Sequence, residues 1–361
     1  MQKYKYYLKQ RRILGRRWKN RQIFISFAPQ SGNLSCSFHT DFMLGRRHYR
    51  IKVFQALYAW FQGGESRQDV AERALLQSID KIMELYYLQL SFFLEVIGFY
   101  RLRSEDGKNK FYPTEEELNP NLKLLENSLI SCLQKNKDLQ KQFNLYKFSW
   151  TEEQEMVRKI YLKVRNLKDL RTYFNQAETS FEADRDIVYR IFKKCISKSP
   201  ELQFYCEERN IFWVEDYQSA ALFILKTLKQ IPENFPDSQS LVSLFPKDED
   251  DDPREDRKFI VDLFKKTISQ SDHLEERIRL KTKNWELERI ALTDIILIKM
   301  AMVELMQFSS IPVKVTMNEY IELSKLFSTP KSKMFINGLL DKLVEDLRKE
   351  KKIRKKGRGL L

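Results

Sequence analysis

The chain has 361 residues, of which 42% are hydrophobic and 13% aromatic, enough for two helical domains or for one domain with a large insertion. Only 10 glycines and 10 prolines occur, so the composition disfavours turn-rich sheets and barrels and favours long helices with short links. Four widely spaced cysteines and three histidines form no metal-ligand pattern, which argues against a zinc site and favours reduced, buried thiols in a cytoplasmic protein.

The formal net charge of +14 is concentrated at the two ends of the chain. Residues 1–52 carry a net charge of +12 and residues 347–361 a net charge of +7, which leaves −5 for the rest. A nearly neutral body with two basic ends is typical of a protein that binds a polyanion, above all a nucleic acid. A pair of solubilising tails would give the same distribution.

Residues 1–42 form a basic extension whose pattern differs from that of the remaining chain. A Ser/Gly/Asn/Pro stretch lies at 28–33, and no continuous apolar segment of a secretory signal is present. Met43 then opens a regular helical pattern. One hypothesis is that Met43 is the biological start and that residues 1–42 are not part of the native protein.

Residues 43–110 are predicted to form the N-terminal helices. Apolar side chains recur on one face from Ile51 to Phe61, which predicts a helix over 46–62. Its first turns hold the cations Arg46, Arg47, Arg50 and Lys52. Each cation there opposes the helix dipole at a cost of about 0.3–1 kcal/mol, so we expect these side chains to contact phosphates. Tyr58, near the apolar face, could stack on a base or belong to the core.

A second helix is predicted over 66–103, followed by a helical expansion over 111–231. The apolar stretch 85–99 follows Glu84 and is interrupted by Gln89 and Glu95, so we interpret it as a core helix and predict no membrane span. Residues 232–253 are predicted to be a linker, because three prolines precede a run of five acids and a fourth proline.

Residues 254–347 are predicted to form a compact helical bundle, with helices over 259–279, 286–308, 312–327 and 331–351. Residues 348–361 form a basic tail. Lys331, Lys333 and Phe335 place cations and an aromatic ring together at one helix start, as an RNA-binding surface would. Phe335 could equally be a core residue.

No sequence motif of catalysis or nucleotide binding is present. G-x-S-x-G, H-E-x-x-H, the phosphate-binding G-x-x-x-x-G-K-[ST] and G-x-G-x-x-G are all missing. We therefore expect a protein that is not an enzyme, with no cofactor, no bound metal and no small-molecule substrate.

Two stretches resemble the NusB family. The first is RRHYR (46–50) followed by QALYAW (55–60), which is similar to the family's opening helix. The second runs from ERI (288–290) through IPVKV (311–315) and NEYIELSKLF (318–327) to FINGLLDK (335–342). Its order and spacing resemble the whole C-terminal subdomain of the family. Residues 64–252 are much longer than the corresponding part of NusB and suggest a lineage-specific insertion.

The resemblance implies an all-α, NusB-like helical bundle with two subdomains and a large helical insertion. It implies binding of boxA-type ribosomal RNA leader sequence together with the ribosomal protein NusE, and action on the RNA polymerase elongation complex against termination. By matching positions, Arg46, Arg47, Arg50, Tyr58 and Phe335 would contact RNA, and Asp294 would face NusE. Lys331 stands where the family often has an acid, so contacts in that loop would differ.

Two other functions remain open at this point. The large insertion permits a ribosome-assembly scaffold that hardly contacts RNA. NusB-like domains also serve as the RNA-binding module of ribosomal RNA cytosine methyltransferases, but we expect no such enzyme here because no glycine-rich cofactor domain follows the bundle.

Overall fold

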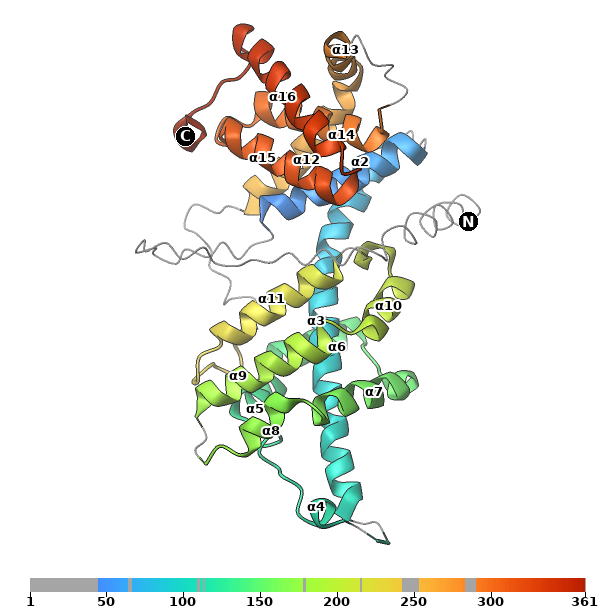
Figure 1. Ribbon diagram of the computed structural model, residues 1–361, viewed down its shortest axis with the longest axis vertical. Helices are drawn as coiled ribbons and strands as arrows, with labels where there is room; N and C mark the ends of the chain where they lie inside the picture. The colour runs from blue at the N-terminus through green and yellow to red at the C-terminus, as the bar shows by residue number, and fades with distance from the viewer. Residues whose placement is uncertain are drawn as a thin grey trace. The chain divides into compact units, whose positions relative to one another are not determined.

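The structure, a computed structural model, describes residues 45–63, 67–108, 111–112, 114–177, 180–214, 216–241, 253–282 and 290–360 (Figure 1). These residues form helices joined by short connections and contain no strand, so the predicted all-α fold is confirmed. The predicted extension 1–42 and the hypothesis of a start at Met43 lie outside the described residues.

The helices in chain order are α2 (Arg46–Gly63), α3 (Gln68–Lys108), α4 (Glu115–Leu118), α5 (Ser128–Lys135), α6 (Lys137–Tyr146), η1 (Thr151–Glu153), α7 (Gln154–Arg165), α8 (Lys168–Phe174), α9 (Phe181–Ile191), the π-helix η2 (Phe192–Ile196), α10 (Pro200–Arg209), η3 (Ile211–Trp213), α11 (Tyr217–Gln230), α12 (Pro253–Ser269), α13 (Ser271–Lys281), α14 (Leu292–Gln307), α15 (Val313–Phe327), α16 (Ser332–Lys349) and η6 (Gly357–Leu360).

One hydrophobic core lies in a bundle formed by α2, the first part of α3 and α12–α16, which we call the C-terminal bundle. Helix α14 is its centre, since every residue from Asp294 to Leu305 is buried. A helix that is apolar around its whole circumference has to be surrounded by other helices. In agreement, α14 contacts α2, α12, α13, α15 and α16.

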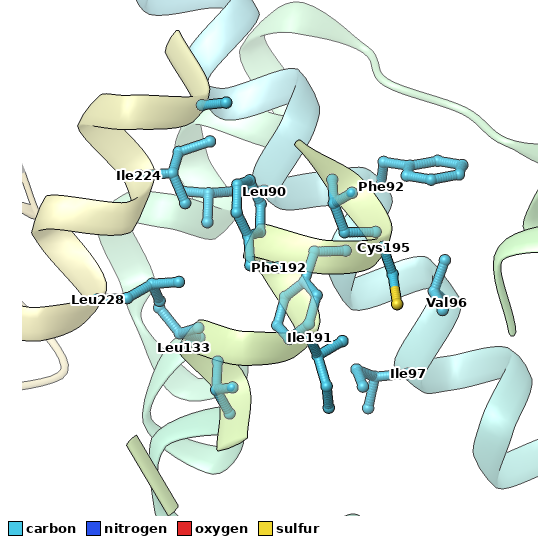
Figure 2. Packing of buried hydrophobic residues seen from close by; sticks show 14 of the residues in the cluster. Leu90, Phe92, Val96, Ile97, Leu133, Ile191, Phe192, Cys195, Ile224 and Leu228 are labelled. Atoms are coloured by element: carbon cyan, nitrogen blue, oxygen red, sulfur yellow. The ribbon is translucent and has the colours of Figure 1, made fainter. Parts of the chain in front are cut away.

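A second core lies in the middle region, formed by the later part of α3 with the helices from α5 to α11. Figure 2 shows how side chains from distant segments meet there: Leu90, Phe92, Val96 and Ile97 of α3, Leu133 of α5, Ile191, Phe192 and Cys195 of α9 and η2, and Ile224 and Leu228 of α11. The predicted helical expansion therefore has an apolar interior of its own.

The expected buried, reduced thiols are found at Cys195 and Cys206, while Cys132 is partly buried. Burial raises the pKa of Cys195 to about 11, so this thiol stays protonated at neutral pH. Cys36 lies outside the described residues.

Helix α3 belongs to both cores, which corrects the boundary predicted near residue 110. Leu75 packs in the C-terminal bundle, whereas Leu85 to Ile97 pack in the middle region. The helix also continues to Lys108, past the end predicted at residue 103. By length and composition α3 could cross a membrane, but 67% of its most apolar window is buried inside the protein, as expected of a core helix.

Two further boundaries differ from the sequence predictions. The single helix predicted over 259–279 is divided at Gln270, whose φ of −102° and ψ of 7° end α12 before Ser271 opens α13. The described part of the predicted linker, 232–241, is also anchored to the middle region at two buried residues. Phe235 and Leu241 are buried in the core of the middle region, and Lys137 N–H donates to the carbonyl of Asp237 at 2.7 Å.

The packing of the middle region predicts a large difference between two phenylalanines. Phe192 is fully buried, so Phe192→Ala should lower the free energy of unfolding by about 3–5 kcal/mol. Phe204 is 64% exposed, and Phe204→Ala should change it by less than about 0.5 kcal/mol. Urea unfolding followed by circular dichroism measures both, and equal losses would contradict the assignment of this core.

Candidate nucleic-acid interface

The four cations at the start of α2 divide into an exposed pair and a buried pair. Arg46 and Arg47 are exposed, whereas Arg50 and Lys52 are each only 2% exposed. Neither Arg50 nor Lys52 offers its charge to solvent in this structure, so this packing does not support the predicted phosphate contacts of these two side chains. Their charges are used inside the protein.

Arg50 forms a two-pronged ion pair with Glu304 of α14. Its Nε and Nη2 donate to the two carboxylate oxygens at 2.7 and 2.8 Å. The hydroxyls of Thr316 and Tyr320, both on α15, donate to the same carboxylate at 2.8 and 3.1 Å. Glu304 is fully buried, and these four donors satisfy it. One carboxylate thus joins α2, α14 and α15.

Burial of Arg50 would by itself lower its pKa, but the charge and hydrogen bonds of Glu304 outweigh that effect and raise it. Burial, reinforced by the charge of Glu304, raises the pKa of Tyr320 well above its ordinary value. Both side chains therefore keep the protonation state that donates to Glu304. Breaking such a buried pair typically costs about 3–5 kcal/mol, because the remaining charge is left without a partner.

Lys52 connects α2 to the middle region. Its Nζ donates to Asp216, which precedes α11 and is 1% exposed, and lies 3.4 Å from the carbonyl of Phe212. His48, one turn earlier in α2, places Nε2 3.4 Å from the other oxygen of Asp216. That contact has the distance of an ion pair but not the alignment of a hydrogen bond.

Arg47 is half exposed and is anchored on one side only. Its Nε and Nη2 donate to Glu319 of α15 at 2.8 and 2.7 Å, while 47% of the side chain remains accessible. Burial of Glu319 acts to raise its pKa, but the hydrogen bond and the charge of Arg47 prevail and lower it. The pair orients the guanidinium and leaves part of it open to a further anion.

Arg46 stacks its guanidinium over the ring of Phe259 on α12, with 5.6 Å between Cζ and the ring centroid. Arg50 approaches the same ring at 5.6 Å. Contacts of this kind fix a flat cation without neutralising it. Arg46 consequently keeps its charge available at the surface.

The aromatic candidates lie toward the other end of α2. Phe54 packs against Phe327, the last residue of α15, with their ring centroids 4.5 Å apart. Tyr58 follows Phe54 by one turn, at 6.3 Å, and Lys331 follows Phe327 by four residues. The structure therefore brings the end of α2 and the start of α16 to one part of the bundle, although they are far apart in sequence.

Lys331 and Lys333 are exposed there, while Tyr58 and Phe335 are partly buried against the core of the C-terminal bundle. Each ring thus combines a packing role with some accessible surface. Both the core and the base-contacting interpretations of the two rings are compatible with this position.

Asp294 does not occupy the surface expected of a partner-contacting residue. It is 4% exposed, and its Oδ1 accepts no hydrogen bond within the part of the chain that the structure describes. Its position in the first turn of α14 favours an acid through the helix dipole. The carboxylate is enclosed in this structure, and its contact with a protein partner stays a prediction.

The sequence analysis missed the residues that position α2, namely Glu304, Thr316, Glu319 and Tyr320. One signal was present. Glu304 and Lys299 interrupt the otherwise apolar run of α14, and a charge in a fully buried helix needs a partner. Lys299 has such a partner in Glu275, at 2.6 Å. Within the described ranges, no three His, Cys, Asp or Glu side chains form a group suited to a metal ion.

Comparison with known proteins identifies one family. The model of the NusB family matches residues 216–345, from the start of α11 nearly to the end of α16, so the match begins earlier than the C-terminal resemblance and does not include α2. No solved structure matches the chain.

Three similar curated proteins carry the name transcription antitermination protein NusB. The protein of Salinibacter ruber is 37% identical over 139 residues, which cover 38% of this chain and 86% of the relative. That of Bacillus pumilus is 33% identical over 126 residues, 35% of this chain and 92% of the relative. That of Chloroherpeton thalassium is 34% identical over 105 residues, 29% of this chain and 50% of the relative.

The buried ion pair predicts that Glu304→Ala lowers the free energy of unfolding by about 3–5 kcal/mol, since it strands Arg50 in the interior. Replacing both partners, as Arg50→Met with Glu304→Met, should recover most of that loss. Glu276→Ala, which breaks an exposed pair with Arg279, is the control and should change stability far less, because water screens this pair. Equal losses for Glu276→Ala and Glu304→Ala would contradict the stabilising role assigned to the Arg50–Glu304 pair.

The Arg47–Glu319 pair predicts a pH dependence. Because the pKa of Glu319 is lower in the fold than in the unfolded chain, its contribution is fully present above the unfolded pKa, about 4.3. It is lost as the pH falls through the folded pKa. Glu319→Gln should therefore have a lower Tm than the wild type at pH 7, with the difference shrinking below about pH 4. A difference that stays constant down to pH 3 would refute this.

Proposed function

The chain belongs to the NusB family, and from that premise we propose that it is an RNA-binding transcription antitermination factor that acts as a scaffold without catalytic turnover. In the proposed role it binds boxA-type ribosomal RNA leader sequence with the ribosomal protein NusE in the cytoplasm. The complex then helps the RNA polymerase elongation complex resist termination.

The observation that carries this proposal is the combination of exposed cations and partly exposed rings along α2. Arg47 and Tyr58 are eleven residues apart, close to three helical turns, so they share one face about 16 Å apart. Lys331 and Lys333 join that face beyond the Phe54–Phe327 contact. Such an arrangement suits single-stranded RNA, whose phosphates need cations and whose unstacked bases need flat partners.

Arg46, Arg47, Lys331 and Lys333 would then contact phosphates, and Tyr58 and Phe335 would stack on bases. Arg50 and Lys52 take a different part in this proposal. Through Glu304 and Asp216 they hold α2 at a fixed angle, so that the exposed cations are oriented before RNA arrives. Preorganisation of this kind reduces the loss of conformational entropy that accompanies binding.

The second candidate function is a ribosome-assembly scaffold with little RNA affinity of its own. It is favoured by the middle region, which has its own core and displays large apolar side chains, among them Phe111 and Tyr112 at 89% and 86% exposure. Exposed rings of this size are typical of protein contact sites.

The proposed RNA contacts predict the effect of a double variant. Arg47→Ala with Lys331→Ala should weaken binding of a boxA-like RNA oligonucleotide and flatten the plot of log K against log salt by about 0.7 for each lost contact. Fluorescence anisotropy across a salt series measures the slope. Arg158→Ala with Lys168→Ala, exposed cations of the middle region, removes the same charge and should leave the slope unchanged. An unaltered slope in the first variant would overturn the phosphate assignment.

The two candidate functions differ in what added NusE does. An antitermination factor should bind the boxA-like RNA more tightly when NusE is present, and more tightly than an RNA of scrambled sequence. Tight NusE binding with no gain in RNA affinity would favour the scaffold.

A further inference from the structure

The basic C-terminal segment is not a free tail in the part of the chain that the structure describes. After α16 it returns along the C-terminal bundle (Figure 1). The Nζ of Lys355 donates to the carbonyl of Phe308 at 2.9 Å, and the backbone N–H of Lys356 donates to the carbonyl of Ser309 at 3.0 Å. Residues 350–360, which we call the docked segment, are therefore attached to the loop between α14 and α15.

Two features show that the sequence is adapted to this docking. Gly359 is buried so tightly that a Cβ atom there would lie 2.0 Å from the carbonyl oxygen of Ser309, so only glycine fits. At the other end, Glu350 pairs with Arg277 of α13 and, at 2.8 Å, with Lys352. Hydrogen bonds from these two cations lower the pKa of Glu350 to about 2, so it stays ionised at any physiological pH.

The docked segment lies beside the start of α2, although the two are about 300 residues apart in sequence. The rings of Phe308 and Phe259 pack with their centroids 4.8 Å apart, and the guanidinium of Arg46 lies over the ring of Phe259. A second connection between the docked segment and α2 is electrostatic and involves Lys355. Burial lowers the pKa of its Nζ, and the charge of Glu304, the partner of Arg50, opposes that shift.

Within the described residues, this juxtaposition gathers cations that have no ion-pair partner. Within the described residues, the exposed cations Arg46, Lys314, Arg354 and Lys356 form no ion pair. Lys314 belongs to the first turn of α15, five residues after Ser309. Holding like charges together in a fixed segment is unfavourable unless a polyanion relieves the repulsion.

The carboxylates in the same area are already occupied by arginines, since Glu304 pairs with Arg50, Glu319 with Arg47 and Glu350 with Arg277. An external anion would therefore not compete with these three carboxylates for the cations.

We propose that the docked segment is part of the RNA-binding surface: Arg354 and Lys356, together with Lys314 and Arg46, bind the phosphate backbone of RNA that continues past the start of α2. This inference rests on the proposed RNA-binding function. It extends the surface to residues beyond 345, where the family match ends. In this arrangement α2 lies between two cationic sites, with Lys331 and Lys333 toward its end and the docked segment beside its start.

The test uses the full chain and single-stranded RNA labelled for anisotropy, in a short boxA-like form and in forms lengthened by six uridines at either end. Arg354→Gln with Lys356→Gln should reduce the salt slope of one lengthened form by about 1.4. Its affinity at 0.1 M salt should therefore fall by about five-fold for each lost contact, when the affinities at 1 M salt are taken as the reference. The short form should be affected much less. Arg158→Gln with Lys168→Gln is the charge-matched control and should change neither.

A third variant separates docking from charge. Gly359→Val keeps every cation but cannot fit against Ser309, so it should undock the segment and lose part of the same affinity. Circular dichroism and Tm are recorded for each variant to confirm that the bundle remains folded.

The outcomes distinguish this inference from the proposed function. If the wild type binds none of the RNAs above background, the proposed function fails, and this inference fails with it. If the wild type binds all RNAs and the Arg354/Lys356 variant binds the lengthened forms with an unchanged slope, the inference alone is overturned. If Gly359→Val binds like the wild type while the charge variant does not, the segment acts as a flexible tail and the docked arrangement is refuted.

Discussion

The buried ion pair between Arg50 and Glu304 is the interaction on which the candidate interface depends. A charged pair with no solvent contact is stable only when every donor and acceptor is matched, and here Thr316 and Tyr320 complete the carboxylate. This requirement permits one placement of α2 against α14 and α15. The rotation of α2 that satisfies Glu304 also directs Arg47 to Glu319 and lays Arg46 on Phe259.

The same helix is held from the opposite direction by the middle region. Lys52 donates to Asp216 at the start of α11, and α3 contributes to both hydrophobic cores. The middle region therefore contributes to the support of α2. Phe235 and Leu241 pack in the middle core, so the chain that leaves α11 stays attached to that core as far as residue 241.

These contacts determine which of the positive charges reach solvent. A net charge of +14 with basic ends indicated a polyanion partner, but it did not separate cations that reach solvent from cations that stabilise the interior. The fold makes that separation within a single helix, where Arg46 and Arg47 face outward and Arg50 and Lys52 face inward. It also draws the basic C-terminal residues to the same part of the bundle through Lys355 and Gly359.

The sequence by itself determined the helical class, the position of most helices and the family, because apolar periodicity and the motif order of the C-terminal bundle are local properties of the chain. Only the tertiary structure decided which candidate residues are accessible. Arg50 and Lys52 are buried because they pair with Glu304 of α14 and with Asp216, which precedes α11. Asp294 is buried in the first turn of the central helix α14. Partners far apart in sequence are brought together by packing, which no local pattern encodes.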